Sequence, residues 1–227
     1  WVPSMPPAAN TDMFAALTQS ELGRFISSSK GRDKKGVRIR VMDKADIQQM
    51  VTWFADAAER AQKAGFDGVE IHAGHTYIIS GFLSPYYNKR DDEYGGPLEN
   101  RARLLLEVIH AVRERVGRDY PVWMRMDAIE LDLPGGISLE DATLTARIAQ
   151  DAGIDLISVS AYANLSTGNA FTKAPIPQER AMFLDWAAHI RKQVDIPVTA
   201  AGRLDPDVAD KAVADGKCDF VAMGRKL

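Results

Sequence analysis

Two histidines and a tyrosine lie close together, directly after a short apolar segment. His72 and His75 are three positions apart, and Tyr77 follows two positions later. Two imidazole N–H groups can hold one carbonyl or phenolate oxygen and stabilise the negative charge that develops on it. A phenol can supply a proton at neutral pH when the acceptor is as basic as an enolate carbon. This triplet therefore predicts a site that binds an oxygen atom and delivers a proton.

Two other interpretations of the histidine pair stay open. Zinc sites take about three or four protein ligands, and the chain has no other cluster of Cys or His. We therefore expect no metal site. The pair could also consist of core histidines whose ring nitrogens bond to the backbone. His110 and His189 fall inside predicted helices, and we interpret both as surface or packing residues.

A second group of residues could bind an anionic ligand. Arg125 stands within an apolar segment, and a buried guanidinium needs an anionic or strongly accepting partner. That partner is either a structural carboxylate or an electron-rich ligand ring. Gly202-Arg203 and Gly224-Arg225 each follow an apolar segment. Glycine lets backbone amides approach a phosphate and arginine can fork onto its oxygens, so these steps predict a phosphate site; turn glycines beside surface arginines are the alternative.

Five helix–strand units would position these residues. Apolar residues recur at helical spacing in several segments, and each such segment is followed by a short apolar run. The predicted helices cover residues 43–64, 98–116, 138–153, 180–194 and 206–214, and the predicted strands cover 68–72, 122–126, 156–160, 197–201 and 220–223. Short apolar strands between amphipathic helices are typical of a parallel sheet covered by helices.

The positions of the polar residues favour a closed barrel over an open sheet. They follow strand after strand, at His72, Arg125, Ser160, Gly202 and Gly224. A (β/α)₈ TIM barrel gathers all such strand ends around one mouth and commonly binds phosphate after its last two strands. An open doubly wound sheet would concentrate them at one switch point. We therefore expect an α/β fold of the barrel type.

The predicted barrel is incomplete. Only five strands are clear, and residues 1–7 could be the tail of another, so about strands 3 to 8 of the barrel are present. The chain begins at Trp1 and stops at Leu227, directly after an apolar segment. We therefore expect residues 1–227 to form one barrel domain that is truncated at both ends. The basic stretch over residues 8–42 is interpreted as a solvated loop.

Composition narrows the class of protein. The 227 residues are 46% hydrophobic and 26% charged, with a net charge of −3. Such a balance argues against a protein that binds nucleic acid through bulk electrostatics, and no run of about 18 apolar residues predicts a membrane span. Cys218 is the single cysteine, which suits a reducing compartment. We expect a cytoplasmic protein that acts on a small molecule and could form a homo-oligomer.

A long stretch of sequence resembles the signature of the Old Yellow Enzyme family. It comprises the segment from Gly65 to Tyr77, followed by Phe82-Leu83-Ser84-Pro85, Asn88, Arg90, Tyr94-Gly95-Gly96 and Asn100-Arg101. That family comprises FMN-dependent (β/α)₈ oxidoreductases. The similarity continues to Met223-Gly224-Arg225, and the last third is most similar to the branch of 2,4-dienoyl-CoA reductase and NADH oxidase.

The resemblance implies a role for each candidate residue. His72 and His75 match the pair that holds the activating carbonyl oxygen of the substrate, and Tyr77 matches the proton donor. Arg125 matches the arginine beside the pyrimidine edge of the flavin. Gly202, Arg203, Gly224 and Arg225 match positions near the FMN phosphate. The implied reaction uses NADH or NADPH to reduce the activated C=C bond of an α,β-unsaturated carbonyl or enoyl thioester.

The sequence also departs from the family pattern and leaves alternatives. Thr76 stands where the family usually has glycine before the tyrosine. The branch carries an iron–sulfur cluster after the barrel, and Cys218 alone cannot ligate one, so a cluster is expected only in a longer parent chain. The alternatives to an ene-reductase are an oxidative member of the family, such as an amine dehydrogenase or a desaturase, and a non-catalytic partial barrel that binds a phosphorylated ligand.

Overall fold

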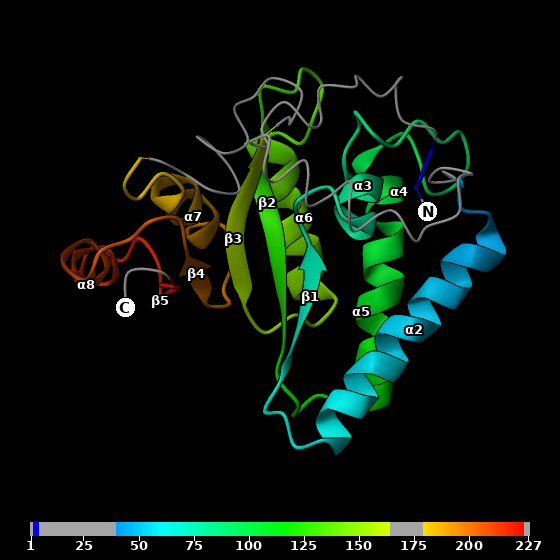
Figure 1. The fold of residues 1–227 in the computed structure, drawn as a ribbon, viewed down its shortest axis with the longest axis horizontal. Helices are drawn as coiled ribbons and strands as arrows, with labels where there is room; N and C mark the ends of the chain where they lie inside the picture. Colours follow the sequence, from blue (N-terminus) through cyan, green and yellow to red (C-terminus); the bar gives the residue numbers. More distant parts are fainter. Residues whose placement is uncertain (1, 5–39, 164–178, 225–227) are drawn as a thin grey trace, which may run out of the picture.

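The computed structural model describes residues 2–4, 40–163 and 179–224 (Figure 1). This part of the chain contains five strands and seven helices, and at least one helix separates each strand from the next. The strands are β1 (Val69–Ala73), β2 (Val122–Leu131), β3 (Ile157–Ala163), β4 (Val198–Ala200) and β5 (Phe220–Val221). The helices are α2 (Lys44–Lys63), α3 (Ile78–Leu83), α4 (Leu98–Arg101), α5 (Arg103–Val116), α6 (Leu139–Asp151), α7 (Leu184–Arg191) and α8 (Pro206–Ala214).

The strands form one parallel sheet in the order in which they occur in the chain. The order is β1-β2-β3-β4-β5, and each neighbouring pair is parallel. A doubly wound sheet reverses its strand order at a switch point, whereas a barrel sheet is wound in one direction throughout. The described strands therefore confirm the parallel α/β fold and have the strand order of a barrel.

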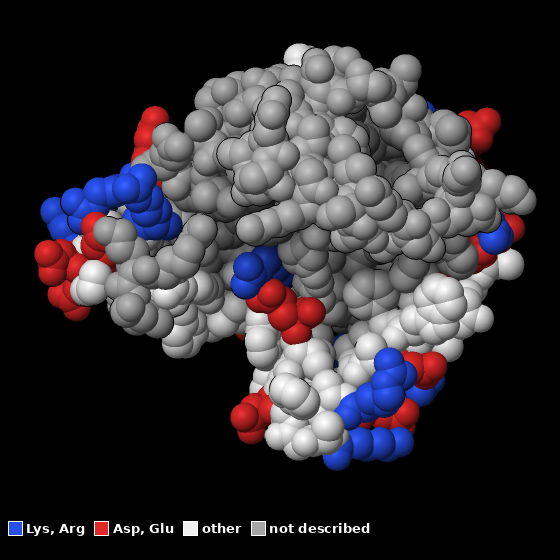
Figure 2. Space-filling view, viewed as in Figure 1, with Lys and Arg blue, Asp and Glu red and all other residues white. Residues whose placement is uncertain are grey.

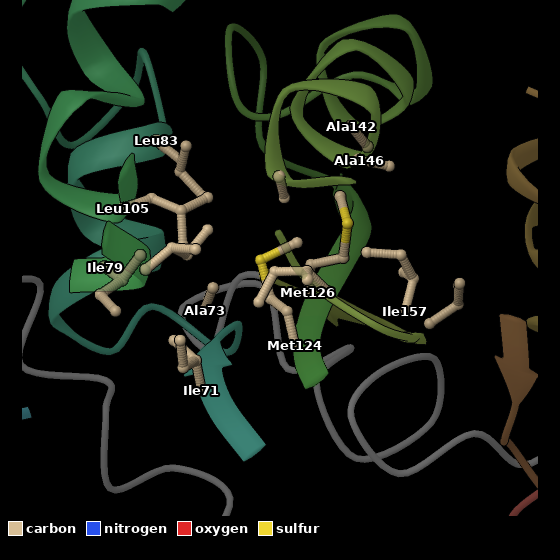
Figure 3. Packing of buried hydrophobic residues seen from close by; sticks show 14 of the residues in the cluster. Ile71, Ala73, Ile79, Leu83, Leu105, Met124, Met126, Ala142, Ala146 and Ile157 are labelled. Atoms are coloured by element: carbon tan, nitrogen blue, oxygen red, sulfur yellow. The ribbon is translucent and has the colours of Figure 1, made fainter. Parts of the chain in front are cut away.

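The two faces of the sheet differ in chemistry. Side chains alternate between the faces along each strand. One face is apolar and packs against α3, α5 and α6; Figure 3 shows Ile71, Ala73, Met124, Met126 and Ile157 meeting Ile79, Leu105, Ala142 and Ala146. The opposite face carries the polar set Glu70, His72, Trp123, Arg125 and Ser158, which the register places side by side. The polar side chains thus share one surface because the strands are parallel and in register.

Helix α2 shows how local sequence sets an element boundary. The Asp46 N–H donates to Asp43 Oδ1 (2.8 Å), and the Asp43 N–H donates to Asp46 Oδ2 (3.1 Å). This reciprocal pair satisfies backbone donors that the first turn leaves free. Helix α2 then runs beside α5 (Figure 1). The predicted helix over residues 43–64 is therefore confirmed.

Some predicted boundaries were wrong. The predicted helix over residues 98–116 divides into α4 and α5 at Ala102, and α3 occupies a region with no predicted helix. Strand β2 runs to Leu131, five residues beyond its predicted end, with a register irregularity between Asp127 and Glu130. Acidic residues normally indicate a loop, but here both are buried within the strand. Of residues 1–7 the structure describes residues 2–4, in which Val2 forms an isolated parallel bridge with Val41.

Surface charge in the described part of the chain is mixed in sign. On the face shown in Figure 2, basic and acidic side chains adjoin one another rather than gather into a patch of one sign. Among the described helices, none combines the length and the apolar character that a bilayer crossing requires. The predicted basic loop over residues 8–42 lies largely outside the described residues.

Candidate active site

The structure brings His72, His75 and Tyr77 together at the carboxyl end of β1. His72 belongs to β1, and Tyr77 is the residue before α3. The ring centroid of His72 lies 5.0 Å from that of His75 and 5.1 Å from that of Tyr77. The three side chains that the sequence analysis singled out therefore form one compact group.

A tight left-handed turn creates this grouping. His75 and Thr76 have φ angles of 58° and 56°, a conformation that is costly for residues with a Cβ, and especially for a β-branched residue. The Tyr77 N–H donates to the Gly74 carbonyl (3.2 Å), and the Thr76 hydroxyl donates to the His75 carbonyl (2.7 Å). Thr76 therefore adopts the backbone conformation that glycine would occupy at lower cost.

Two residues from neighbouring strands hold His75. Its Nε2 lies 2.7 Å from Ser160 Oγ on β3. Its backbone N–H donates to Asp127 Oδ2 on β2 (2.6 Å), and its Nε2 lies 3.8 Å from Asp127 Oδ1. Ring and backbone of His75 are thus both anchored, as an oxygen-binding group requires for a defined orientation.

Both imidazoles are neutral near pH 7. Burial, followed by electrostatic repulsion from His72 and Arg125, lowers the pKa of His75 to about 4. Burial is also the largest cause that lowers the pKa of His72, followed by the charge of Arg125 and opposed by that of Glu70. A neutral imidazole has one N–H donor and one lone pair. Each ring can therefore donate one hydrogen bond to a ligand oxygen.

Tyr77 stands at the rim of an open cavity. The residue is 63% exposed. The cavity has a volume of about 480 Å³ and is lined by Met50 and Phe54 of α2 together with His72, Thr76, Tyr77 and Ile78. Its walls are largely apolar, and its polar groups come from the β1–α3 turn. A ligand in this cavity would meet the phenol and one imidazole.

Arg125 has a structural ion-pair partner. Its Nε lies 2.9 Å from Glu70 Oε1, and its Nη2 donates to Glu70 Oε2 (3.4 Å). The indole N–H of Trp123 donates to the same carboxylate (2.8 Å). A guanidinium has five N–H donors, and the side chain is 37% exposed on the polar face. Arg125 therefore has a structural carboxylate as its partner, which was one of the two predicted alternatives. Its remaining N–H groups can donate to a ligand.

The two glycine-arginine steps follow neighbouring strands. Gly202 and Arg203 come after β4 and have φ angles of 101° and 56°. A Cβ on Gly202 would lie 2.8 Å from the Phe183 ring, so the turn itself requires this glycine. Gly224 comes after β5, and a Cβ there would meet nothing within 4 Å. Arg225 lies outside the described residues.

Three acidic residues around these groups were not among the residues predicted from the sequence. Glu70 pairs with Arg125, Asp127 holds the turn at His75, and Glu130 accepts from Ser84 (2.6 Å). A signal was available, because Glu70 is two positions before His72 and Asp127 is two positions after Arg125. Residues two apart in a strand share a face, so alternation would have placed each acid on the same face as the site residue two positions away.

Comparison with known proteins identifies the family to which the chain belongs. The family described as NADH:flavin oxidoreductase / NADH oxidase matches residues 11–227. The chain is 39% identical to the NADH oxidase of Thermoanaerobacter brockii over 193 residues, covering 85% of this chain and 29% of that protein. It is 35% identical to the cinnamate reductase of Clostridium sporogenes over 209 residues, covering 85% and 31%.

A solved structure supports the same fold. The complex of 2-naphthoyl-CoA reductase with 2-naphthoyl-CoA matches with a TM-score of 0.77 at 36% identity, covering 86% of this chain and 29% of that one. The chain therefore spans roughly three tenths of the length of each of these three proteins. The resemblance to the Old Yellow Enzyme family is confirmed by the matching family and its relatives.

Proposed function

Because the chain belongs to the NADH:flavin oxidoreductase / NADH oxidase family, we propose that its site reduces the activated C=C bond of an α,β-unsaturated carbonyl compound or enoyl thioester. NADH or NADPH would supply the electrons through FMN. The observation that carries this proposal is the grouping of two neutral imidazoles and an exposed phenol at the end of β1. We further propose that residues 1–227 belong to one FMN-binding barrel domain of a longer protein.

The residues present fit FMN by the chemistry of their donors. Arg125 offers cationic N–H groups on the polar face of the sheet, where an electron-rich ring could lie. The backbone at Gly224 leaves space where a side chain would otherwise stand, so a phosphate can approach it. We assign the FMN phosphate to Gly202, Arg203, Gly224 and Arg225. When bound, FMN supplies the hydride chemistry, and the protein supplies orientation and electrostatics.

His72 and His75 would bind the substrate oxygen. In the reduction, the β-carbon of the alkene takes a hydride and negative charge moves onto the carbonyl oxygen. Two neutral imidazole N–H donors stabilise this charge more than they stabilise the uncharged carbonyl. Loss of one such donor costs about 10²–10³ in rate in enzymes with comparable oxyanion sites.

Tyr77 would complete the reaction by protonating the α-carbon. The phenol O–H bond breaks, a C–H bond forms, and the resulting phenolate regains a proton from solvent, to which this residue is open. A strongly basic enolate carbon makes this transfer favourable at neutral pH. Tyr77 lies beside His72, which supports a proton donor and an oxygen-binding group that act on the same substrate.

The names of two relatives support the class of substrate. Cinnamate is an acid whose C=C bond is conjugated with its carboxyl group, and 2-naphthoyl-CoA is an aromatic thioester. The cavity beside Tyr77 has apolar walls from Met50, Phe54 and Ile78. An aryl or acyl substituent would bury apolar surface against these residues. We therefore favour aromatic enoic acids or enoyl thioesters within the proposed class.

The test follows flavin oxidation state in the full protein loaded with FMN. NADH or NADPH should bleach the flavin, and subsequent anaerobic addition of an enone, a cinnamate or an enoyl thioester should restore its absorption. A protein that holds FMN and reacts with NAD(P)H, yet is reoxidised by no activated alkene, would contradict the reductase assignment. Bleaching by a substrate without NAD(P)H would point to the oxidative alternative.

A further inference from the structure

A fully buried carboxyl group lies beneath the turn that carries His75. Asp127 is 2% exposed and belongs to β2. Its Oδ2 accepts hydrogen bonds from the His75 backbone N–H (2.6 Å) and from Ser80 Oγ (3.3 Å). Its Oδ1 is buried and has no hydrogen-bond partner among the described residues. A Cβ on Gly74 would lie 3.1 Å from this oxygen, so the turn passes directly over the carboxyl.

We propose that Asp127 is a positioning residue of the reduction site, which holds the left-handed turn and keeps the surroundings of the His75 imidazole uncharged. The link to alkene reduction rests on the proposed function of the site. The link between Asp127 and His75 does not, because it follows from the contacts alone. No step of the proposed chemistry requires Asp127 to touch the substrate.

The first part of this role is to stabilise the backbone at His75 and Thr76. Two consecutive non-glycine residues with positive φ are unfavourable in isolation, so the surrounding structure must hold them. A buried N–H without an acceptor would add a further penalty. The 2.6 Å contact to Asp127 supplies the acceptor for the His75 N–H. Removal of that acceptor would release the turn and with it the orientation of the imidazole.

The second part concerns charge. Burial is the largest cause that raises the pKa of Asp127, and the nearby Glu130 carboxyl adds to it. The bonds from His75 and Ser80 oppose the shift, and the resulting pKa is about 8. Asp127 is therefore mostly neutral at pH 7. Since Oδ2 already accepts two hydrogen bonds, the acid hydrogen belongs on Oδ1, the oxygen 3.8 Å from His75 Nε2.

A neutral Asp127 suits an oxyanion site. An ionised carboxylate 3.8 Å from the His75 ring would repel the negative charge that develops on an oxygen held by that ring. The other charged or titratable groups that face this region are Glu130 and Arg125 on β2, His72 on β1 and Asp141 of α6, which lines the same small cavity as Asp127. None of these accepts a hydrogen bond from His75 in the described structure. Ionisation of Asp127 should therefore change the electrostatic environment of His75 more than ionisation of any of these other acids.

Glu130 offers a matched control. It lies in the same strand, is buried, and burial raises its pKa as well. Its Oε2, however, accepts from Ser84 Oγ and from the Ile137 N–H. Asp127→Asn and Glu130→Gln thus remove similar buried acids, and only the first acts directly on the His75 turn. The asparagine oxygen of Asp127→Asn can still accept from the His75 N–H, whereas Asp127→Ala cannot provide an acceptor.

The experiment uses the full FMN-loaded protein and two readouts that need no alkene turnover. The first is the imidazole NMR signal of His75, identified by its loss in His75→Asn. In the unmodified protein it should show an inflection near pH 8. The inflection should vanish in Asp127→Asn and remain in Glu130→Gln, shifted to lower pH because the charge of Glu130 is removed. The second is the affinity for 4-methylphenol, which should fall about tenfold as the carboxyl ionises, and should be flat with pH in Asp127→Asn.

The outcomes separate this inference from the proposed function. Asp127→Ala should weaken 4-methylphenol binding at pH 7, whereas Asp127→Asn should keep most of the affinity of the unmodified protein. The absence of a His75 inflection near pH 8 in the unmodified protein overturns the charge argument even if no variant folds. Equal behaviour of Asp127→Asn and Glu130→Gln overturns the specific role of Asp127. A protein that shows the expected coupling but reduces no alkene would instead contradict only the proposed function.

Discussion

The Nε2 atom of His75 lies 2.7 Å from the Oγ atom of Ser160, although the two residues are 85 positions apart in the chain. The hydrogen bond that one ring nitrogen makes determines which nitrogen carries the proton in a neutral imidazole. When Ser160 donates to Nε2, the hydrogen of His75 is on Nδ1 and can be offered to a ligand. In that arrangement Ser160 would fix the tautomer of His75 that offers its Nδ1–H to a ligand.

Replacement of His75 should separate the two half-reactions. We expect His75→Ala to weaken binding of phenolic ligands and to slow flavin reoxidation by an activated alkene about 10²-fold, because one oxyanion donor is lost. Flavin reduction by NAD(P)H should change much less, since no carbonyl oxygen is held in that step. Stopped-flow measurement of each half-reaction tests this expectation. His110→Ala, at an exposed position on α5, is the control, and equal losses in both half-reactions would contradict the assigned role.

Two glycines that follow neighbouring strands should respond differently to alanine. Gly202→Ala should destabilise the fold by about 1–3 kcal/mol, because a Cβ at positive φ must displace the Phe183 ring. Gly224→Ala meets no atom within 4 Å, so its free energy of unfolding without FMN should be nearly unchanged. If the phosphate lies at this strand end, Gly224→Ala should still lower FMN affinity. Urea unfolding and flavin titration measure the two effects, and an unchanged FMN affinity in Gly224→Ala would remove it from the phosphate site.

The ion pair between Arg125 and Glu70 allows a test of the flavin assignment. Arg125→Met should weaken FMN binding, because the cationic donors on the polar face are lost. Glu70→Gln removes the competing carboxylate and should leave FMN affinity equal or higher. It should also lower the pKa of His72 further, since Glu70 opposes the effect of Arg125 on that ring. Fluorescence titration with FMN and NMR titration of His72 check both parts; tighter FMN binding in Arg125→Met would refute the assignment.

The positive φ angle of Thr76 is expected to lower the free energy of unfolding of the protein. Glycine adopts a φ of 56° without the steric cost that threonine carries, although it adds entropy to the unfolded chain. Thr76→Gly should therefore stabilise the protein by about 0.5 kcal/mol after both effects are combined. Thr76→Ala keeps the steric cost and loses the bond to the His75 carbonyl, so it should not stabilise. Thermal unfolding of the two variants provides the comparison, and equal melting temperatures would show that the turn stores no such strain.

The histidine and the buried acid should give opposite trends of stability with pH. His75 has a folded-state pKa of about 4 and an unfolded value near 6.5. Between these values the unfolded chain binds more protons, so stability falls as the pH drops. Asp127 has a folded-state pKa of about 8 against an unfolded value of 3.8, so its effect on stability becomes less favourable as the pH rises through this window.

Variants distinguish these two contributions. Relative to the unmodified protein, His75→Asn should lose less stability between about pH 6.5 and pH 4. Asp127→Asn should gain relative stability as the pH rises from about 4 to 8, because its amide cannot ionise. Melting temperatures measured across this range test both trends. A difference between Asp127→Asn and the unmodified protein that does not vary with pH would contradict the raised pKa of Asp127.

Much of the fold was predictable because the relevant signals are local. Helical spacing of apolar residues placed α2 and α6 within a residue or two of their observed bounds, and Pro206 correctly marked the start of α8. Helix α3 was missed because six residues are too few to show a period, and its buried Ser80 and Gly81 are more typical of loops. Helix propensity did not predict the structure of these residues, because their contacts in the tertiary structure determine it.

The same division applies to the site. The sequence by itself determined that His72, His75 and Tyr77 would lie together, because residues within one turn cannot be far apart. It could not determine that Asp127 and Ser160 would anchor His75, or that Glu70 would pair with Arg125. Those contacts depend on parallel register, which joins residues more than fifty positions apart. The register is set by packing of the apolar face of the sheet against α5 and α6 (Figure 3). This packing is a property of the tertiary structure and cannot be derived from local sequence.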